Sequence, residues 1–243
     1  MRDVYSKYWL TAREKKYGFM PYDAGLCELV RSKAPEGSKL FEVAIGTGYP
    51  VADYLQKAGY EIHGIDISPA LIEKCHETNP AIHAQLGDAE NLEFADAEFD
   101  GTYCFHSLWV IPDVKRVISE MLRVTRPGGA VLFDLQNAAN PAIAEAHRQS
   151  VEKLRPGLGA RLELYARNTA KVLLRRGNAN WHAINYEVPA LPSEIFDHLK
   201  SLGASDIEVY ARNESDQSIA RVDELGDLSE HQRLVVTCVR PTR

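Results

Sequence analysis

Apolar and polar positions in the first half of the chain switch repeatedly between short apolar runs and helical spacing. The apolar runs predict five buried strands, at residues 39–45, 61–66, 81–86, 100–105 and 130–135. Helical patterns lie between these runs, and Ser68-Pro69 supplies an N-cap followed by a proline suited to the first helical position. Strands that alternate with helices are typical of a doubly wound α/β sheet.

The pattern on either side of this alternating segment is different. Aromatic residues at helical spacing predict a helix that ends at Gly18, and a second amphipathic helix follows with Tyr22 and Leu26 on one face. Beyond the fifth strand, a helix at about 141–154 precedes three strand-like runs with a hairpin turn at Gly177-Asn178. The three runs lie at 161–167, 170–175 and 181–188. After them the sequence predicts a helix at 193–202 and strands at 207–210 and 233–239. The acidic stretch 213–230 has little apolar periodicity and is expected to be a solvated loop.

Composition narrows the class of protein. The 243 residues are 45% hydrophobic and 26% charged, which excludes a disordered or collagen-like chain. The four cysteines form no close pair, so neither a zinc knuckle nor a CxxC redox motif is present. A net charge of −6 disfavours binding to nucleic acid. The first residues lack a signal-peptide core and no apolar run approaches about 18 residues, so we expect a cytoplasmic protein without a membrane partner.

A glycine turn after the first predicted strand is the main candidate binding feature. In Glu42-Val-Ala-Ile-Gly46-Thr-Gly48, glycine permits positive φ and lets a ligand approach the bare backbone at a helix N-terminus. Asp66 ends the next strand, where a carboxylate can accept hydrogen bonds from both ribose hydroxyls. Val51 stands where a dinucleotide fingerprint needs its third glycine, which disfavours a dehydrogenase of Rossmann type.

Three further segments follow in fixed order: Gly87-Asp88-Ala89, the run 99–103 and Arg126-Pro-Gly-Gly129. With the glycine turn they resemble the class I S-adenosylmethionine-dependent methyltransferases, in particular the small-molecule, ubiquinone-biosynthesis-like branch. The resemblance covers about residues 38–136. It implies a Rossmann-like sheet of seven strands whose last strand, 233–239, is antiparallel.

The resemblance also assigns residues to the cofactor, S-adenosyl-L-methionine, and to its product S-adenosyl-L-homocysteine. The methionine part would lie on the glycine turn, the ribose on Asp66, and the adenine against Ile67, with Asp88 and the Ala89 backbone at its amino group. The residues implied for cofactor binding are Glu42, Gly46, Gly48, Asp66, Ile67, Asp88, Ala89 and Phe105.

Two departures from the family pattern stand in the glycine turn. Ala44 replaces the usual first glycine, and its methyl group is expected to be tolerated if the backbone there is extended. Tyr49-Pro50 leaves one fewer backbone N–H at the start of the following helix.

On this reading one methyltransferase domain spans residues 1–243. We expect an N-terminal helical lid at 1–37, the cofactor-binding core at 38–136, and a small antiparallel β insertion over the site at 137–190. The C-terminal helix and last strands would occupy 191–243.

The candidate catalytic base follows the fourth predicted strand. His106 follows Phe105 there and is expected to face the crevice, where an imidazole with a pKa near 6.5 can accept a hydroxyl proton. A histidine that only lines the pocket is the alternative. Asp134, Gln136 and Asn137 resemble the ligands of magnesium-dependent methyltransferases in type, but the other acidic ligands cannot be assigned, so no metal is expected.

Aromatic, cationic and imidazole side chains in the flanking parts are candidate substrate contacts, although packing or solvation explains each one as well. They are Tyr8, Tyr22, Trp109, Tyr165, Arg167, His182 and Tyr186. The sequence thus predicts a methyltransferase that acts on a small molecule, at a hydroxyl oxygen, by in-line displacement. Transfer to nitrogen or carbon, and a non-catalytic cofactor-binding subunit of the same fold, stay open. So does the choice between monomer and homodimer.

Overall fold

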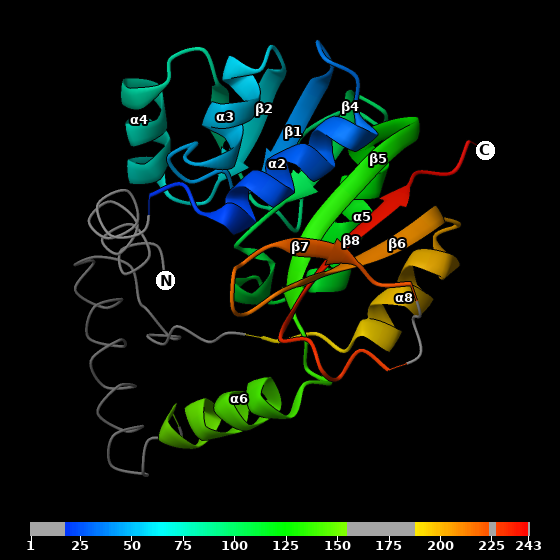
Figure 1. Ribbon diagram of the computed structural model, residues 1–243. Coiled ribbons are helices and arrows are strands. Elements are labelled where there is room, and N and C mark those ends of the chain that lie inside the picture. The colour runs from blue at the N-terminus through cyan, green and yellow to red at the C-terminus, as the bar shows by residue number, and fades with distance from the viewer. Residues whose placement is uncertain (1–17, 155–187, 224–226, 243) are drawn as a thin grey trace, which may run out of the picture.

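The computed structural model describes residues 18–154, 188–223 and 227–242, and it is built around one sheet (Figure 1). Eight strands form this sheet within the described residues, in the order β3-β2-β1-β4-β5-β8-β6-β7. The strands are β1 (Lys39–Val43), β2 (Glu61–Asp66), β3 (His83–Leu86), β4 (Phe99–Cys104), β5 (Thr125–Gln136), β6 (Ser205–Arg212), β7 (Ile219–Arg221) and β8 (Arg233–Val239).

The first five strands form the parallel half of the sheet and confirm the predicted α/β alternation. β1 is central, with Val43 opposite Ile65 of β2 and Glu42 opposite Tyr103 of β4. All five strands run in the same direction, so their carboxyl ends meet at one edge. Ligands of doubly wound folds bind at this edge.

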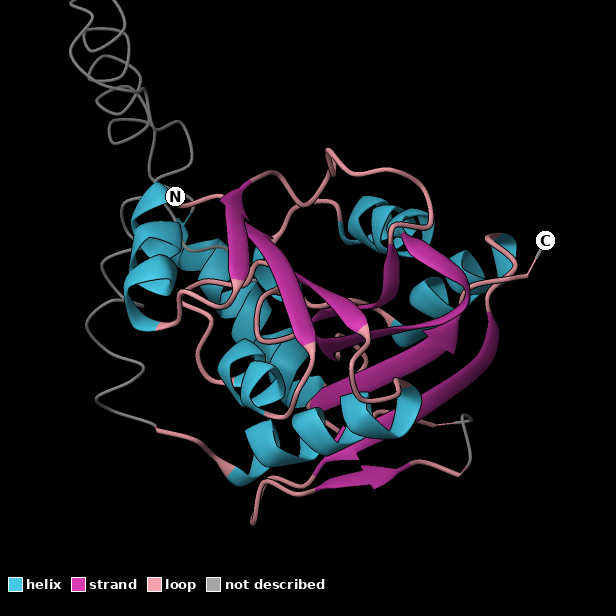
Figure 2. Cartoon of the chain, turned by 90° about the horizontal axis from the view of Figure 1, so that it is seen from above, coloured by secondary structure: helices cyan, strands magenta, loops and turns pink. Residues whose placement is uncertain are grey.

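Helices cover both faces of the sheet, as Figure 2 shows from above. The core side chains of α2, α3 and α4 pack on one face, and those of α5 and α8 on the other. The helix bounds are α2 (Pro21–Lys33), α3 (Val51–Lys57), α4 (Pro69–Thr78), α5 (Val114–Val124), α6 (Pro141–Leu154) and α8 (Pro192–Ser201), with a 3-10 turn η1 (Leu108–Val110). Ser68 caps α4 by accepting from the Leu71 N–H, as its sequence predicts.

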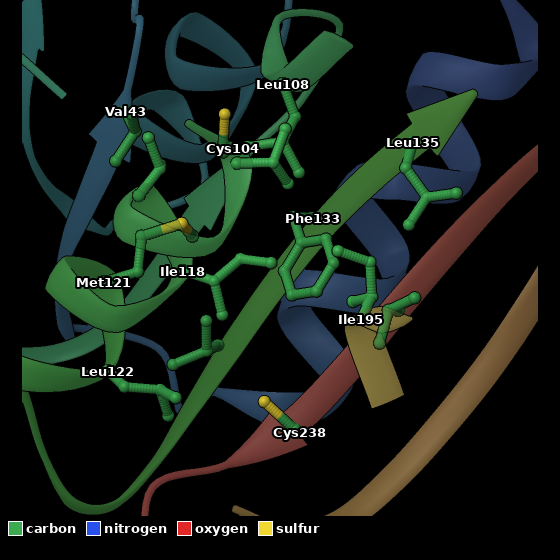
Figure 3. Packing of buried hydrophobic residues seen from close by; sticks show 14 of the residues in the cluster. Val43, Cys104, Leu108, Ile118, Met121, Leu122, Phe133, Leu135, Ile195 and Cys238 are labelled. Atoms are coloured by element: carbon green, nitrogen blue, oxygen red, sulfur yellow. The ribbon is translucent and has the colours of Figure 1, made fainter. Parts of the chain in front are cut away.

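The core on the α5 face joins strands that lie far apart in the sequence (Figure 3). Phe133 of β5 is completely buried, among Ile118 and Met121 of α5 and Ile195 of α8. Apolar runs such as Val131–Phe133 are expected where both faces of a parallel sheet are covered.

The antiparallel last strand is confirmed, because β8 lies between β5 and β6 and is antiparallel to both. The sheet nevertheless has one strand more than predicted. Residues 213–230 were expected to be a solvated loop, but Ile219–Arg221 forms β7 and pairs with β6. This prediction was wrong because β7 is short and largely exposed at the sheet edge. Its sequence therefore shows no alternation of apolar and polar residues.

Some predictions fall outside the described residues. The helix before Gly18, the strands at 161–167, 170–175 and most of 181–188 lie there, with Tyr8, Tyr165, Arg167, His182 and Tyr186. In the described part of the chain, none of the helices combines the length and the apolar character needed to span a bilayer.

Candidate cofactor and acceptor site

A cavity of about 320 Å³ opens at the carboxyl ends of β1, β2 and β4, where the fold predicts a ligand. Its volume is at the lower end of the range for small-molecule sites. The residues singled out from the sequence that line it are Glu42, Gly46, Asp66, Ile67, Asp88, Ala89, Phe105 and His106. The topology therefore brings together residues that are up to 64 positions apart, Glu42 and His106 being the extremes.

The glycine turn between β1 and α3 forms one wall. Gly46 has φ +59°, and a Cβ placed there would meet no atom within 4 Å. A ligand can therefore approach the backbone at Gly46 directly. Gly48 has φ +80°, but its Cβ position is 3.0 Å from Cys75 Sγ and Ile82 Cδ1. Gly48 thus allows α4 to pack closely and does not itself line the cavity.

Ala44 does not meet the condition that the sequence analysis set for it. Its methyl group was expected to be tolerated if the backbone there is extended, but its φ is +58°, in the left-handed region. The chain already turns at the end of β1, two residues before Gly46. A left-handed alanine costs about 1–2 kcal/mol relative to the ordinary region, so the turn is strained at this residue.

Asp66 connects the glycine turn to the start of α4. Its Oδ2 accepts from the Gly46 N–H at 3.0 Å, and its Oδ1 accepts from the Ser68 N–H at 2.8 Å. Burial raises the pKa of this carboxyl above its ordinary value, although the backbone N–H groups lower it in part. Each carboxylate oxygen retains a lone pair, so Asp66 can also accept from two ligand hydroxyls.

The residues expected around an adenine lie at the outer end of the cavity. The Ile67 side chain is 50% exposed, which is unusual for isoleucine and leaves an apolar surface available to a ring. Asp88 is exposed, and its Oδ1 accepts from the Glu90 N–H at 2.9 Å. Ala89 beside it is half-buried.

Glu42 and Phe105 lie at the inner end of the cavity. Glu42 is only 6% exposed and Phe105 only 2%. Buried Tyr103 lies beside Glu42, and burial followed by the Glu42 charge raises the pKa of this tyrosine well above its ordinary range. The tyrosine therefore stays a neutral phenol, and Glu42 is the acidic group of this end.

His106 is held between two buried carboxylates. Its Nε2 lies 2.8 Å from Asp23 Oδ1, and its backbone N–H donates to Asp134 Oδ1 at 2.7 Å. The second oxygen of Asp23 accepts from the Met20 N–H at 3.0 Å. His106 has φ +60°, a conformation that a non-glycine residue keeps only when its surroundings hold it.

Tyr22 and Trp109 are buried, with 2% and 7% of their surfaces exposed, and neither is among the residues that line the cavity. The Tyr22 hydroxyl donates to Asp134 Oδ2 at 3.0 Å, and the Arg233 guanidinium lies 4.2 Å from the centre of the Trp109 ring. Burial and the Asp134 charge raise the pKa of Tyr22 well above its ordinary value, which keeps this donor protonated. Tyr22 bonds to Asp134 and Trp109 packs against Arg233, and substrate contact by either residue stays a prediction.

Sequence reasoning missed Asp23. This residue precedes every motif and is 83 positions from His106, so only the packing of α2 on the sheet shows the contact. The one local signal is its place in the first turn of α2, where its side chain accepts from the backbone N–H of the N-cap residue Met20. That signal predicts a helix cap and not the contact with His106. Asp134 was considered as a metal ligand, but in the structure it binds His106 and Tyr22.

Comparison with known proteins agrees with this geometry. A family profile described as a methyltransferase domain matches residues 41–133, the segment that carries β1 to β5 and most of the cavity wall. Residues 41–133 of this chain thus carry a methyltransferase domain. The methyltransferase core thus coincides with the part of the chain in which the motifs were found.

Similar proteins carry several activities in their names. The chain is 33% identical over 113 residues to a malonyl-[acyl-carrier protein] O-methyltransferase of Serratia marcescens, covering 46% of this chain and 43% of the relative. It is 29% identical over 136 residues to a demethylmenaquinone methyltransferase of Desulfitobacterium hafniense, covering 52% and 54%. The matched region thus spans about half the length of these relatives.

A solved structure extends the likeness in fold. The crystal structure of a SAM-dependent methyltransferase from Thermotoga maritima, described as a possible histamine N-methyltransferase, matches with a TM-score of 0.63. The alignment covers 99% of this chain and 100% of that one at 17% identity, so it shows a shared methyltransferase fold.

The methyltransferase cavity fits S-adenosylmethionine, the cofactor of the family. The space beside Gly46 is open where a side chain would otherwise stand, and Asp66 keeps acceptor capacity for ribose hydroxyls. The exposed Ile67 side chain offers an apolar surface at the adenine end. These three features lie on the wall of one cavity.

Proposed function

We propose that this chain is a methyltransferase that uses S-adenosylmethionine to methylate a hydroxyl oxygen of a small molecule. The observation that carries the proposal is His106, a cavity-lining imidazole whose ring and backbone are each bonded to a buried carboxylate. An imidazole in this setting is suited to remove a hydroxyl proton during transfer. The small-molecule class agrees with the names of the relatives, and the oxygen acceptor rests on His106.

Bound S-adenosylmethionine supplies a methyl group on a positively charged sulfur. Gly46 and Asp66 would hold its methionine and ribose parts, with Ile67, Asp88 and Ala89 at the adenine. The chain places these residues on the β1, β2 and β3 ends, while His106 comes from the end of β4. Cofactor and base would thus lie at the same edge of the sheet.

His106 would receive the proton at Nδ1. We assign the Nε2–H tautomer, in which His106 donates to Asp23 and Nδ1 carries the lone pair, because Asp23 as a carboxylate can only accept. Methyl transfer to the acceptor hydroxyl would release its proton, and His106 would take that proton at Nδ1. The resulting imidazolium is stabilised by Asp23 at 2.8 Å and by Asp134, whose Oδ2 is 4.0 Å from Nδ1.

The test is methyl transfer from labelled S-adenosylmethionine to a panel of phenols, catechols, carboxylic acids and amines, followed by mass spectrometry. The proposal expects transfer to a hydroxyl compound. His106→Asn should lower kcat by about 10²-fold or more, the ordinary contribution of a general base. His231→Ala, which removes a half-buried histidine beside Asn137, is the matched control.

Transfer to amines alone, at a rate that His106→Asn leaves unchanged, would favour an N-methyltransferase in which no base is needed. Binding of the cofactor without transfer to any class of acceptor would favour the non-catalytic subunit. Either result contradicts the oxygen assignment.

A further inference from the structure

A second group of chemically active side chains lies away from the cavity, at the opposite end of the sheet. Glu61 begins β2, His63 is two residues further along the same strand, and His83 begins β3. Residues two apart on a strand point to one face, and His63 is the direct register partner of His83. The sheet therefore presents one carboxylate and two imidazoles side by side.

The atoms that could bind a metal are close. One from each side chain, a ring nitrogen or a carboxylate oxygen, lies within 4.8 Å of the other two. His63 Nε2 and Glu61 Oε1 are 2.7 Å apart, and the two imidazole rings stack with their centres 4.6 Å apart. In the described part of the chain, this is the one group of three or more His, Cys, Asp or Glu side chains placed in this way.

These histidines are accessible. His83 and Glu61 are exposed and His63 is half-buried, its ring 5.6 Å from that of Phe99. β3 is an edge strand of the sheet, and Gln85, on the same face as His83, is exposed as well. Packing of the core therefore does not account for two histidines at this place.

We propose that Glu61, His63 and His83 form a surface zinc site, with a water molecule as the fourth ligand. Two imidazoles and one carboxylate are a common ligand set for Zn²⁺. Tetrahedral zinc with bonds of about 2.0–2.1 Å places its ligand atoms roughly 3.4 Å apart. The separations of 4.8 Å or less in the structure thus need shifts of an ångström or so, which the exposed Glu61 and His83 side chains can make by rotation.

The nearest cation does not oppose the site strongly. Lys39 of β1 is the register partner of Glu61, but its ammonium lies 3.4 Å from Glu98 and 4.8 Å from the centre of the Phe99 ring. Glu98 therefore offsets the charge of Lys39, and the Glu61 carboxylate stays available to a metal ion.

Zinc at this place would fasten the edge strand β3 to β2. β3 leads directly to Asp88 at the cavity, so the metal would hold the strand that carries one end of the candidate cofactor site. A metal that binds the folded chain and not the unfolded chain raises the midpoint of unfolding. The zinc site does not depend on the proposed methyl transfer.

The experiment is calorimetric titration of the full chain, free of any histidine tag, with zinc chloride, and thermal unfolding with and without a chelator. We expect one equivalent of zinc to bind and to raise the unfolding midpoint. His83→Ala is the primary variant because His83 is exposed and its loss leaves the core intact. It should weaken zinc binding by about 10- to 100-fold or more, and Glu61→Gln should weaken it too.

His231→Ala serves as the control and should bind zinc as the unchanged protein does. The absence of saturable zinc binding would overturn the proposal. So would full zinc affinity in both His83→Ala and Glu61→Gln, because the metal would then lie elsewhere. Circular dichroism in the presence of the chelator verifies that each variant is folded before it is titrated.

Discussion

Replacement of Asp66 by asparagine is the sharpest test of the cofactor assignment that needs no acceptor. The carboxylate accepts from the Gly46 and Ser68 N–H groups and is expected to accept from the two ribose hydroxyls as well. Asparagine has only one acceptor oxygen. Its NH₂ group would take the place of the other carboxylate oxygen and would there face hydrogen-bond donors. The loss of one charged hydrogen bond costs about 1.5–3 kcal/mol, so the Kd for S-adenosylhomocysteine should rise by roughly ten- to a hundredfold.

The assay is calorimetric titration of Asp66→Asn with S-adenosylhomocysteine at neutral pH. Asp96→Asn is the matched control, because the Asp96 side chain is 71% exposed and Asp96 does not line the cavity. An unchanged Kd in Asp66→Asn would refute the role of Asp66. An equal loss in Asp96→Asn would show that the effect is not specific to the site.

The same substitution carries a prediction about pH. Burial raises the pKa of Asp66 in the folded state, so its protonated form is favoured there. The contribution of Asp66 to stability is therefore full below the unfolded-state pKa and is lost as the pH rises through the folded-state value. Cofactor affinity should change in the opposite direction, since the ionised group is the better acceptor. In Asp66→Asn both dependences should be weaker, and a pH profile equal to that of the unchanged protein would contradict this account.

Three further predictions concern other residues. Ala44→Gly should raise the free energy of unfolding by up to about 1 kcal/mol in urea denaturation, because it relieves the left-handed alanine; a less stable variant would show that Ala44 is unstrained. Arg123→Ala should lower stability by about 2 kcal/mol, since buried Glu120 loses two hydrogen bonds, and an unchanged denaturation midpoint would contradict it. Burial alone would raise the pKa of Glu120, but its bonds to Arg123 and Leu92 bring it below the ordinary value. The stability from Glu120 should thus be lost as the pH falls through that lowered pKa, an acid sensitivity that thermal scans of Glu120→Gln should not show.

The parallel half of the fold was predictable because its signals are local. Buried strands of a parallel sheet read as apolar runs, and Gly46 and Asp66 stand at fixed places relative to those runs. The ends of the strands then bring the cavity-lining residues together by topology alone. Residues such as Asp66 and His106 were therefore identified from their position on predicted strands.

The support of His106 was not predictable in the same way. Asp23 reaches His106 only after α2 has packed on the sheet, and no periodic pattern encodes a contact between single polar groups. The backbone of Ala44 likewise follows from the turn it enters and not from its own preference, which is against positive φ. β7 is a short edge strand whose exposed side chains carry no burial signal.

The central claim is that the cavity beside Gly46 and Asp66 binds S-adenosylmethionine. Its most direct test is calorimetric titration of the purified chain with S-adenosylmethionine, S-adenosylhomocysteine and NAD in parallel. The account predicts saturable binding of both sulfur compounds, one per chain, and no binding of NAD. Binding of NAD alone, or of none of the three, would contradict it.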